Sequence, residues 1–180
     1  MLLLFTLCYQ NCHSNRCLFQ VAFVTQPSGL MDICTALVSY GCHVHGNGVS
    51  PLHCAVDQNS PSTVAAVLSA RLKFPDTVSQ ALATLDDRTG YAPLHAAVRY
   101  SYLECARLLI DAGADVNAVC RNMYGDVSAV TPLELAVRTH NKDAVQLLLQ
   151  SPSCQVDKVG SRHSTALLHA ITRGSIIILQ

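Results

Sequence analysis

Residues 87–117 read DRTGYAPLHAAVRYSYLECARLLIDAGADVN, and this stretch begins with the signals of a turn followed by a helix. Asp87 and Gly90 suit a tight turn, because Asp bonds nearby backbone and Gly tolerates a positive φ. Pro93 suits the first turn of a helix, where its missing N–H is harmless. Leu94 and Val98 then follow a spacing that places apolar side chains on one helical face. The stretch therefore predicts a helix that starts near Pro93.

A second helix is predicted directly after the first. Leu103, Ala106 and Leu109 fall at helical spacing, with Leu108 and Ile110 extending the apolar surface. Gly113 then follows as the C-terminal glycine that ends a helix. The whole stretch is therefore expected to form one helix-turn-helix unit between two turns.

The start of the first helix recurs along the chain. It reads SPLH at 50–53, APLH at 92–95, TPLE at 131–134 and TALL at 165–168, each followed by Ala at the sixth position. The copies are 42, 39 and 34 residues apart. A T-P-L-H-x-A motif at a period near 33 residues is typical of ankyrin repeats. The chain resembles that family, with insertions of roughly nine, six and one residues between its copies.

This resemblance implies an all-α fold, an ankyrin-repeat solenoid of stacked helix-turn-helix units with long inter-repeat loops. We expect about four repeats plus a truncated last one, in an array over residues 20–180 that follows an unassigned apolar segment at 1–19. Two departures from the family pattern are Glu134, which replaces the motif histidine, and Pro152, which stands where the terminating glycine is expected. The expected repeats lie near residues 20–45, 46–70, 87–117, 131–157 and 165–180, the last one incomplete.

Two insertions, at 71–86 and 118–130, interrupt the array. The first contains Val78, Ala81, Leu82 and Leu85 at helical spacing, which predicts a short extra helix. The second lengthens a turn and carries Tyr124. Insertions in repeat arrays fall on loops of one face, often the binding face. The alternative is simple tolerance of loop length, which costs little entropy.

The end of the chain differs from the other copies. Gly174 falls where the family has glycine, and residues 176–179 are the apolar start of a second helix before Gln180. Terminal repeats normally carry a polar outer face, because an uncapped apolar helix pair would be exposed to water. We therefore expect this chain to be a fragment, a truncated isoform or an incomplete gene model.

The composition gives no sign of nucleic-acid or membrane binding. The formal net charge is zero, so a broad electrostatic footprint for either partner is absent. The apolar start MLLLFTLCY has neither a basic n-region nor a small-residue cleavage site, which argues against a secretory signal. Nine cysteines, an odd number at scattered spacing, argue against a disulfide framework. Reduced thiols favour the cytoplasm, the nucleus or both.

Two groups of Cys and His could suggest zinc, at residues 8–17 and 42–54. Neither contains paired C-x-x-C knuckles, so we interpret them as buried thiols and turn histidines, with zinc as the alternative. In the ankyrin pattern the motif histidine bonds the backbone turn that precedes the helix, which implies structural roles for His53 and His95. The common nucleophile, metalloprotease and phosphate-binding motifs do not occur. We therefore expect no catalysis, no cofactor and no metal.

Candidate binding residues follow from the resemblance, since ankyrin domains bind partners through turn tips and the exposed side of the first helices. Tyrosine and arginine are the residue types that form interface hot spots, which favours Tyr91, Arg99, Tyr100 and Arg138. The alternative is ordinary solvated surface. The full set is Asp57, Gln58, Arg88, Tyr91, Arg99, Tyr100, Tyr124, Arg138, Thr139, Thr172 and Arg173.

These features predict a non-catalytic scaffold for protein-protein interaction. The non-uniform repeats, the run GVSPLHCAV at 48–56 and the SPSC interruption at 151–154 are similar to the IκB-like branch of ankyrin proteins. That likeness implies a Rel-type transcription factor as partner and a role in signal transduction and transcription regulation, although the degron and acidic tail of inhibitor members are not seen. Alternatives are a ubiquitin-ligase substrate receptor, here without its SOCS box, the regulatory segment of an enzyme or channel, and a secreted cysteine-rich protein.

Overall fold

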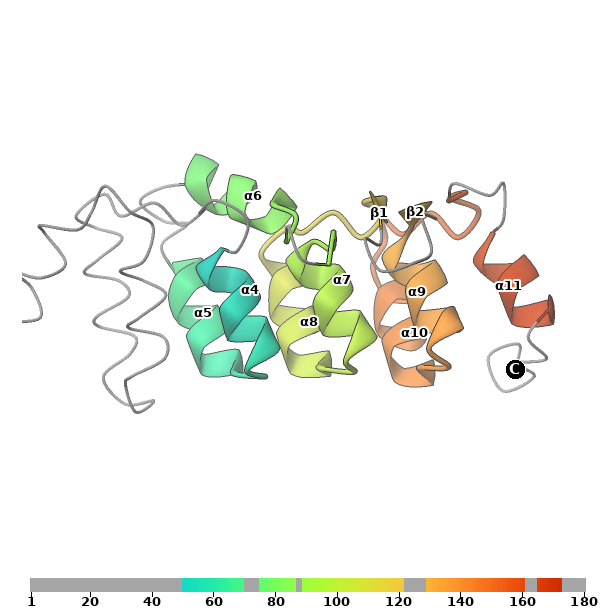
Figure 1. Ribbon diagram of the computed structural model, residues 1–180, viewed down its shortest axis with the longest axis horizontal. Helices are drawn as coiled ribbons and strands as arrows, with labels where there is room; N and C mark the ends of the chain where they lie inside the picture. Colours follow the sequence, from blue (N-terminus) through green and yellow to red (C-terminus); the bar gives the residue numbers. More distant parts are fainter. Residues whose placement is uncertain (1–49, 70–74, 87–88, 122–128, 161–164, 173–180) are drawn as a thin grey trace, which may run out of the picture.

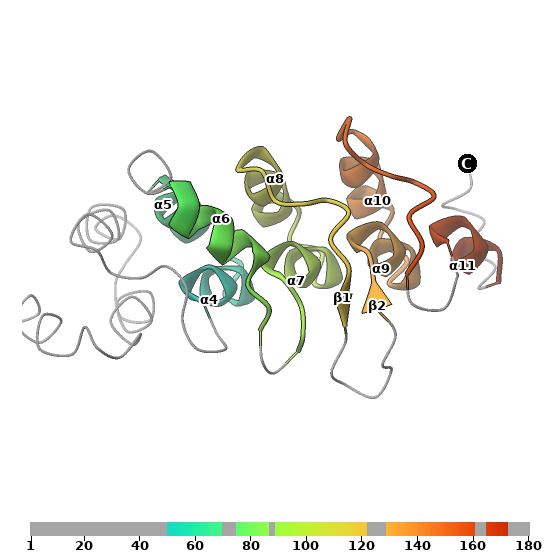
Figure 2. The same cartoon turned by 90° about the horizontal axis from the view of Figure 1, so that it is seen from above.

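The computed structural model describes residues 50–69, 75–86, 89–121, 129–160 and 165–172. Most of these residues form two parallel rows of short helices (Figures 1 and 2). The first row contains α4 (Pro51–Asp57), α7 (Pro93–Arg99), α9 (Pro132–Arg138) and α11 (Ala166–Thr172). The second row contains α5 (Pro61–Ser69), α8 (Leu103–Asp111) and α10 (Lys142–Leu149), packed on α4, α7 and α9. The predicted stack of helix-turn-helix units is confirmed over this part of the chain.

Each first-row helix from α4 to α9 begins at a motif proline, but the residue before it differs. Ser50 and Thr131 accept hydrogen bonds from the backbone N–H groups of His53 and Glu134, which caps α4 and α9. Ala92 has no side chain that could do this for α7. The three copies therefore share a backbone but differ in how each helix start is stabilised.

The turn between the two helices of each unit contains a residue in the left-handed region. Asn59, Ser101 and His140 have φ of 47°, 62° and 55°, although none is glycine. Two of these side chains contact the next unit, since Asn59 Oδ1 accepts from Cys105 Sγ at 3.8 Å and Ser101 Oγ accepts from Asn141 Nδ2 at 2.9 Å. These hydrogen bonds offset part of the conformational cost of the turns.

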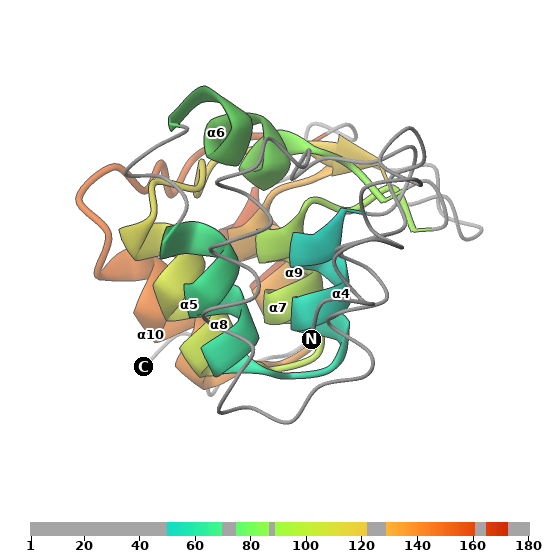
Figure 3. The ribbon, with the colours of Figure 1, turned by 90° about the vertical axis from the view of Figure 1, so that its left-hand side faces the viewer.

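One hydrophobic core runs from α4 to α11 between the two rows. Seen along the stack, α4, α7 and α9 lie in line with one another and α5, α8 and α10 form the second line (Figure 3). Leucine and valine of the first-row motif are buried in the first three copies, as at Leu52, Leu94 and Val98. The core is thus shared between neighbouring units, as expected for a repeat array.

The first insertion forms α6 (Pro75–Ala83), which confirms the predicted extra helix. Its Val78, Ala81 and Leu82 are buried, whereas Leu85 lies beyond the helix and is exposed. The second insertion contains a feature that the sequence did not predict. The strand β1 (Cys120–Arg121) pairs in antiparallel fashion with β2 (Ala129–Val130), on the same side of the stack as α6 (Figure 1).

Several predictions fall outside the described residues. These are the apolar segment at 1–19, the first repeat near 20–45, and the second helix expected at 176–179. Among the residues that the structure does describe, no helix is long and apolar enough to cross a membrane.

Candidate interaction surface

The motif histidines join neighbouring helix units inside the stack. His53 Nε2 lies 2.9 Å from the Tyr91 carbonyl oxygen, and His95 Nε2 lies 3.1 Å from that of Val130. A carbonyl only accepts, so each Nε2 carries the proton and donates. Both rings are buried and bind the turn before the next first-row helix. These contacts give both histidines the structural role that was predicted.

The other ring nitrogen distinguishes the two histidines. His53 Nδ1 accepts from the Ser50 hydroxyl at 2.9 Å, whereas the buried His95 Nδ1 has no hydrogen-bond partner. Ala92 occupies the position of Ser50 in this copy and offers no donor. Burial lowers the pKa of His95 from 6.5 to about 4, so its imidazole is neutral at physiological pH.

The third copy places a carboxylate at the histidine position. Glu134 is buried in α9, and its Oε1 lies 2.8 Å from Nε2 of His169 in α11. Burial raises the pKa of Glu134, and the charges of His169 and Arg138 oppose that rise. In the first two copies the histidine donates to a carbonyl oxygen of the next unit, whereas here the next unit supplies the donor, His169 Nε2. The departure seen in the sequence therefore reverses the direction of the hydrogen bond.

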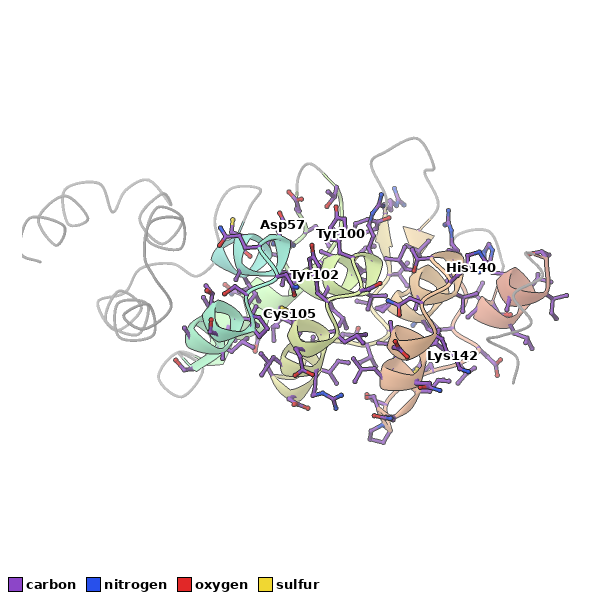
Figure 4. The ribbon with its side chains drawn as sticks, turned by 90° about the horizontal axis from the view of Figure 1, so that it is seen from below. Asp57, Tyr100, Tyr102, Cys105, His140 and Lys142 are labelled. Atoms are coloured by element: carbon purple, nitrogen blue, oxygen red, sulfur yellow. The ribbon has the colours of Figure 1, made fainter. Side chains whose placement is uncertain are left out.

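Four of the candidate binding residues end the four first-row helices. Asp57, Arg99, Arg138 and Thr172 are the last residues of α4, α7, α9 and α11. Three further candidates, Gln58, Tyr100 and Thr139, directly follow the first three of these residues in the sequence. We call the seven residues together the turn edge. All seven are exposed except Arg138, which is half-buried. Figure 4 views the molecule from this side, with Asp57, Tyr100 and His140 spread along the stack.

Arginine and tyrosine side chains gather at the middle of the turn edge. The Arg99 guanidinium lies over the rings of Tyr91 and Tyr100, 5.5 and 5.9 Å from their centroids. The Tyr100 and Tyr102 rings are 5.7 Å apart and tilted. Such cation-π and aromatic contacts favour a preorganised cluster. Tyr102 is not among the predicted candidates, although it lies two residues after Tyr100.

Tyr91 was predicted as an exposed contact, and that prediction of exposure was wrong. The side chain is only 2% exposed and packs in a cluster with Ala92, Cys120 and Val130. Its ring is parallel to that of His95, with centroids 6.0 Å apart, and its hydroxyl accepts from Arg99 Nη1 at 3.1 Å. Tyr91 therefore supports Arg99 from inside the stack.

Three candidates and most of the two Cys-His groups cannot be placed. Arg88, Tyr124 and Arg173 lie outside the described residues, as do the groups at 8–17 and 42–45. Within the described ranges, no cluster of three or more His, Cys, Asp or Glu could hold a metal ion. Burial raises the pKa of the Cys105 and Cys120 thiols, which disfavours the reactive thiolate.

Comparison with known proteins agrees with this architecture. A family model described as ankyrin repeats in three copies matches residues 18–120, and a model of ankyrin repeats in many copies matches residues 94–149. The chain belongs to the ankyrin-repeat family. Ankyrin repeats are a protein-binding module, so the repeats of this chain form such a module.

The relatives of this ankyrin array are much larger proteins. The human transient receptor potential cation channel subfamily A member 1 is 30% identical over 105 residues, which is 58% of this chain and 9% of the channel. Mouse Rabankyrin-5 is 29% identical over 131 residues, 66% of this chain and 10% of that protein. The chain thus spans about a tenth of the length of these curated relatives.

A solved structure resembles nearly the whole chain. The crystal structure of the ankyrin repeat domain of Bcl-3, named there as a unique member of the IkappaB protein family, matches with a TM-score of 0.71 at 29% identity. The match covers 90% of this chain and 66% of the Bcl-3 chain.

Proposed function

We propose that this ankyrin array binds another protein through its turn edge, with Arg99 and Tyr100 at the centre of the contact. The observation that carries this proposal is the exposed cluster in which Arg99 lies over the Tyr100 ring. Tyrosine and arginine supply the largest share of interface hot spots, because they combine apolar area with directed hydrogen bonds. Arg99 is also held from below by the buried Tyr91 hydroxyl, which lowers the entropy lost when a partner binds.

The proposed binding role is non-catalytic. The two buried histidines face backbone carbonyls. The four described cysteines form no disulfide, and Cys54, Cys105 and Cys120 are buried. This arrangement supports structural roles for the side chains that most often carry chemistry. Free thiols also favour a location in the cytoplasm or the nucleus.

A finer proposal is that the array acts as an IκB-like regulator of a Rel-type transcription factor. It is supported by the likeness to the Bcl-3 ankyrin domain over 90% of the chain, together with the sequence features at residues 48–56 and 151–154. The remaining candidates at the turn edge, among them Asp57, Arg138, Thr139 and Thr172, would then extend the contact along several units. Arg88, Tyr124 and Arg173 stay candidates for the same partner.

The alternative is a scaffolding or regulatory segment of a larger protein. Its support is the similarity to a cation channel and to Rabankyrin-5, in which the matched ankyrin region is about a tenth of the protein. A ubiquitin-ligase receptor belongs to the same class of alternative. In each case the array would hold a partner while another domain carries the activity.

Co-expression with a Rel-homology domain tests the finer proposal. We expect the two proteins to co-purify, and we expect Arg99→Ala combined with Tyr100→Ala to weaken binding by at least tenfold, as hot-spot residues do. Thr84→Ala, outside the turn edge, is the matched control. If the two proteins do not co-purify, the IκB-like proposal is wrong. If the double variant binds as tightly as the parent, the turn-edge proposal is wrong.

A further inference from the structure

Arg99 ends α7 with an exposed side chain that tyrosines, rather than an acid, hold in position. Its Nη1 donates to the buried Tyr91 hydroxyl, and its guanidinium carbon lies over the rings of Tyr91 and Tyr100. Arg99 forms no ion pair with any described residue. A guanidinium carries five N–H donors, so most of them remain for a ligand.

Two phenol hydroxyls lie beside Arg99. Tyr100 is 46% exposed, and Tyr102, whose ring lies next to it, is half-buried against the core (Figure 4). Neither hydroxyl makes a hydrogen bond with another described residue. The surface thus combines a positive charge with further donors, which suits a ligand rich in acceptor oxygens.

The turn that carries the two tyrosines is fixed to the next unit by one side chain. Asn141 Nδ2 donates to the Val98 carbonyl oxygen at 3.3 Å and to Ser101 Oγ at 2.9 Å. Its Oδ1 accepts from the backbone N–H of Ala144, which caps α10. The two units therefore present one preorganised surface, and a ligand loses less entropy when it binds there.

The charge of this surface changes sign along the stack. The residue that ends the first-row helix is Asp57 in α4, Arg99 in α7 and Arg138 in α9. Lys142, at the start of α10, is exposed and adds another positive charge to the third unit. A negatively charged ligand is therefore favoured over the α7 and α9 units and disfavoured at α4.

The acidic residues nearest in the sequence to Arg99 and Lys142 do not pair with them. Glu104 and Asp143 stand in the first turns of α8 and α10, where the helix dipole favours a negative charge. Both are exposed, and neither forms an ion pair with a described residue. Arg99 and Lys142 therefore remain available to a carboxylate of another molecule.

We propose that an acidic, extended segment of the partner binds at the Arg99 site, which consists of Arg99, Tyr100, Tyr102 and Lys142. A carboxylate accepts two parallel N–H groups of Arg99, because the planar guanidinium matches its geometry. Neighbouring helices pack roughly 10 Å apart, and polyproline II rises about 3.1 Å per residue with about three residues per turn. Carboxylates three residues apart thus reach neighbouring units. This inference rests on the turn-edge proposal and specifies the chemistry of the partner.

The probe is the capped peptide PEAPEAPEAP, whose prolines favour polyproline II and whose glutamates recur at every third position. It is titrated into the isotopically labelled full chain at about 20 mM salt, where charges are weakly screened, and followed by NMR. We expect saturable shifts at the amides of residues 99–102 and 142. The matched peptide PQAPQAPQAP keeps the length and the prolines without the charge and should bind roughly tenfold more weakly.

Variants of the protein complete the test. Arg99→Gln should weaken binding of the glutamate peptide by roughly tenfold. Arg107→Gln removes the same charge from an exposed arginine on α8, outside the Arg99 site, and should bind as the parent does. Arg99→Lys keeps the charge but cannot make two parallel hydrogen bonds, so it should restore only part of the affinity. Tyr102→Phe keeps the ring, loses the hydroxyl and should weaken binding roughly threefold.

Four results would overturn the proposal. The first is that residues 99–102 do not respond to the glutamate peptide, and the second is that the glutamine peptide binds equally well. The third is an equal loss of binding in Arg99→Gln and Arg107→Gln, which would show general charge attraction. The fourth is binding only of a version with phosphoserine in place of glutamate, which would assign the site to a phosphorylated segment.

The outcome for this inference can be separated from that for the turn-edge proposal. If a protein partner requires Arg99 and Tyr100 but the glutamate peptide does not bind, the turn-edge proposal stands and only the acidic segment is wrong. If the peptide binds at the Arg99 site and the Rel-homology domain does not co-purify, the acidic segment stands and belongs to another partner.

Discussion

The contact between α4 and α7 and the contact between α9 and α11 use the same motif position in opposite ways. At the first, His53 donates to a backbone carbonyl of the next unit and its other ring nitrogen pairs with the Ser50 hydroxyl, so both ring nitrogens are satisfied. At the last, Glu134 accepts from His169 of the next unit, and its second oxygen has no partner. The stack tolerates either chemistry because the helix backbones are positioned by the shared apolar core.

This difference has an energetic consequence. A buried polar group whose hydrogen bonds are all made costs little stability, whereas a buried group with an unmade hydrogen bond is costly. His95, in the middle contact, combines the histidine of the first contact with an unpartnered atom like that of the last. The middle and the last contacts therefore each leave one buried polar atom without a hydrogen-bond partner, whereas both ring nitrogens of His53 in the first contact have one.

The largest expected effect concerns His95 and acid. Its pKa is about 4 in the folded chain and near 6.5 when exposed, so the unfolded state binds more protons between these values. Stability from this group is complete above pH 6.5 and falls with acidification, by about 3 kcal/mol at pH 4. Urea unfolding of the parent and of His95→Gln at a series of pH values tests this. The free energy of unfolding of the parent should exceed that of the variant at neutral pH, and this difference should shrink toward low pH. A constant advantage would show that His95 is not buried in its neutral form.

Glu134 provides the opposing control for that pH series. Its pKa is raised, so the folded state holds the proton more firmly than the unfolded state. Stability from this carboxyl is complete at low pH and is lost as the pH rises through the raised value. Glu134→Gln should remove this component and leave the acid effect of His95 in place.

The second prediction disrupts the last contact alone. A Cβ at Gly160 would lie 2.5 Å from both the Ala129 carbonyl oxygen and Glu134 Oε2. Gly160→Ala should therefore cost about 2 kcal/mol, because the backbone of β2 cannot easily move aside. Hydrogen exchange should show the amides of α11 losing protection before those of α4 and α7. The neighbouring Val159→Ala, at an exposed residue, should change stability by less than about 0.5 kcal/mol.

The third prediction swaps the residue before the motif proline between the first and the middle contacts. Ser50→Ala removes a helix cap and the partner of His53 Nδ1, which should cost about 1.5 kcal/mol. Ala92→Ser should do the reverse in α7 and stabilise the chain by about 1 kcal/mol, since it supplies a cap and a donor to His95 Nδ1. Thermal or urea unfolding of both variants checks the pair. Destabilisation by Ala92→Ser would mean that the cluster around Tyr91 has no room for a hydroxyl.

Much of the fold could be predicted because the motif combines a proline that starts a helix with apolar residues at helical spacing. Pro93, Leu94 and Val98 specify a helix start and a buried face without reference to the rest of the chain. The same spacing identified α6 from Val78, Ala81 and Leu82. The strands β1 and β2 escaped prediction because two-residue strands are too short to show an alternating pattern.

The candidate surface was predicted only in part, since exposure depends on neighbours distant in the sequence. The ends of the first-row helices could be assigned to one edge from the repeat register, and Arg99 and Tyr100 are exposed there. Tyr91 lies in a turn, which suggested exposure, yet Cys120 and Val130 from the β1–β2 region cover it. The polar contact of Glu134 also required the partner His169, 35 residues further along the chain.

The smallest expected effect concerns the turn between α7 and α8, which takes part in the middle contact. Ser101 adopts a φ of 62° and accepts a hydrogen bond from Asn141 of the following unit. Ser101→Gly relieves about 1 kcal/mol of left-handed strain but loses a hydrogen bond of similar worth, so the net change should be near zero. Ser101→Ala loses the hydrogen bond and keeps the strain, so it should cost about 1 kcal/mol. Urea unfolding gives the free energy of unfolding of both variants. The difference between the two values is the cost of the left-handed strain, because both variants lack the hydrogen bond. Equal stability of the two variants would show that the turn is not strained, and that the Asn141 contact alone selects a side chain other than glycine at this position.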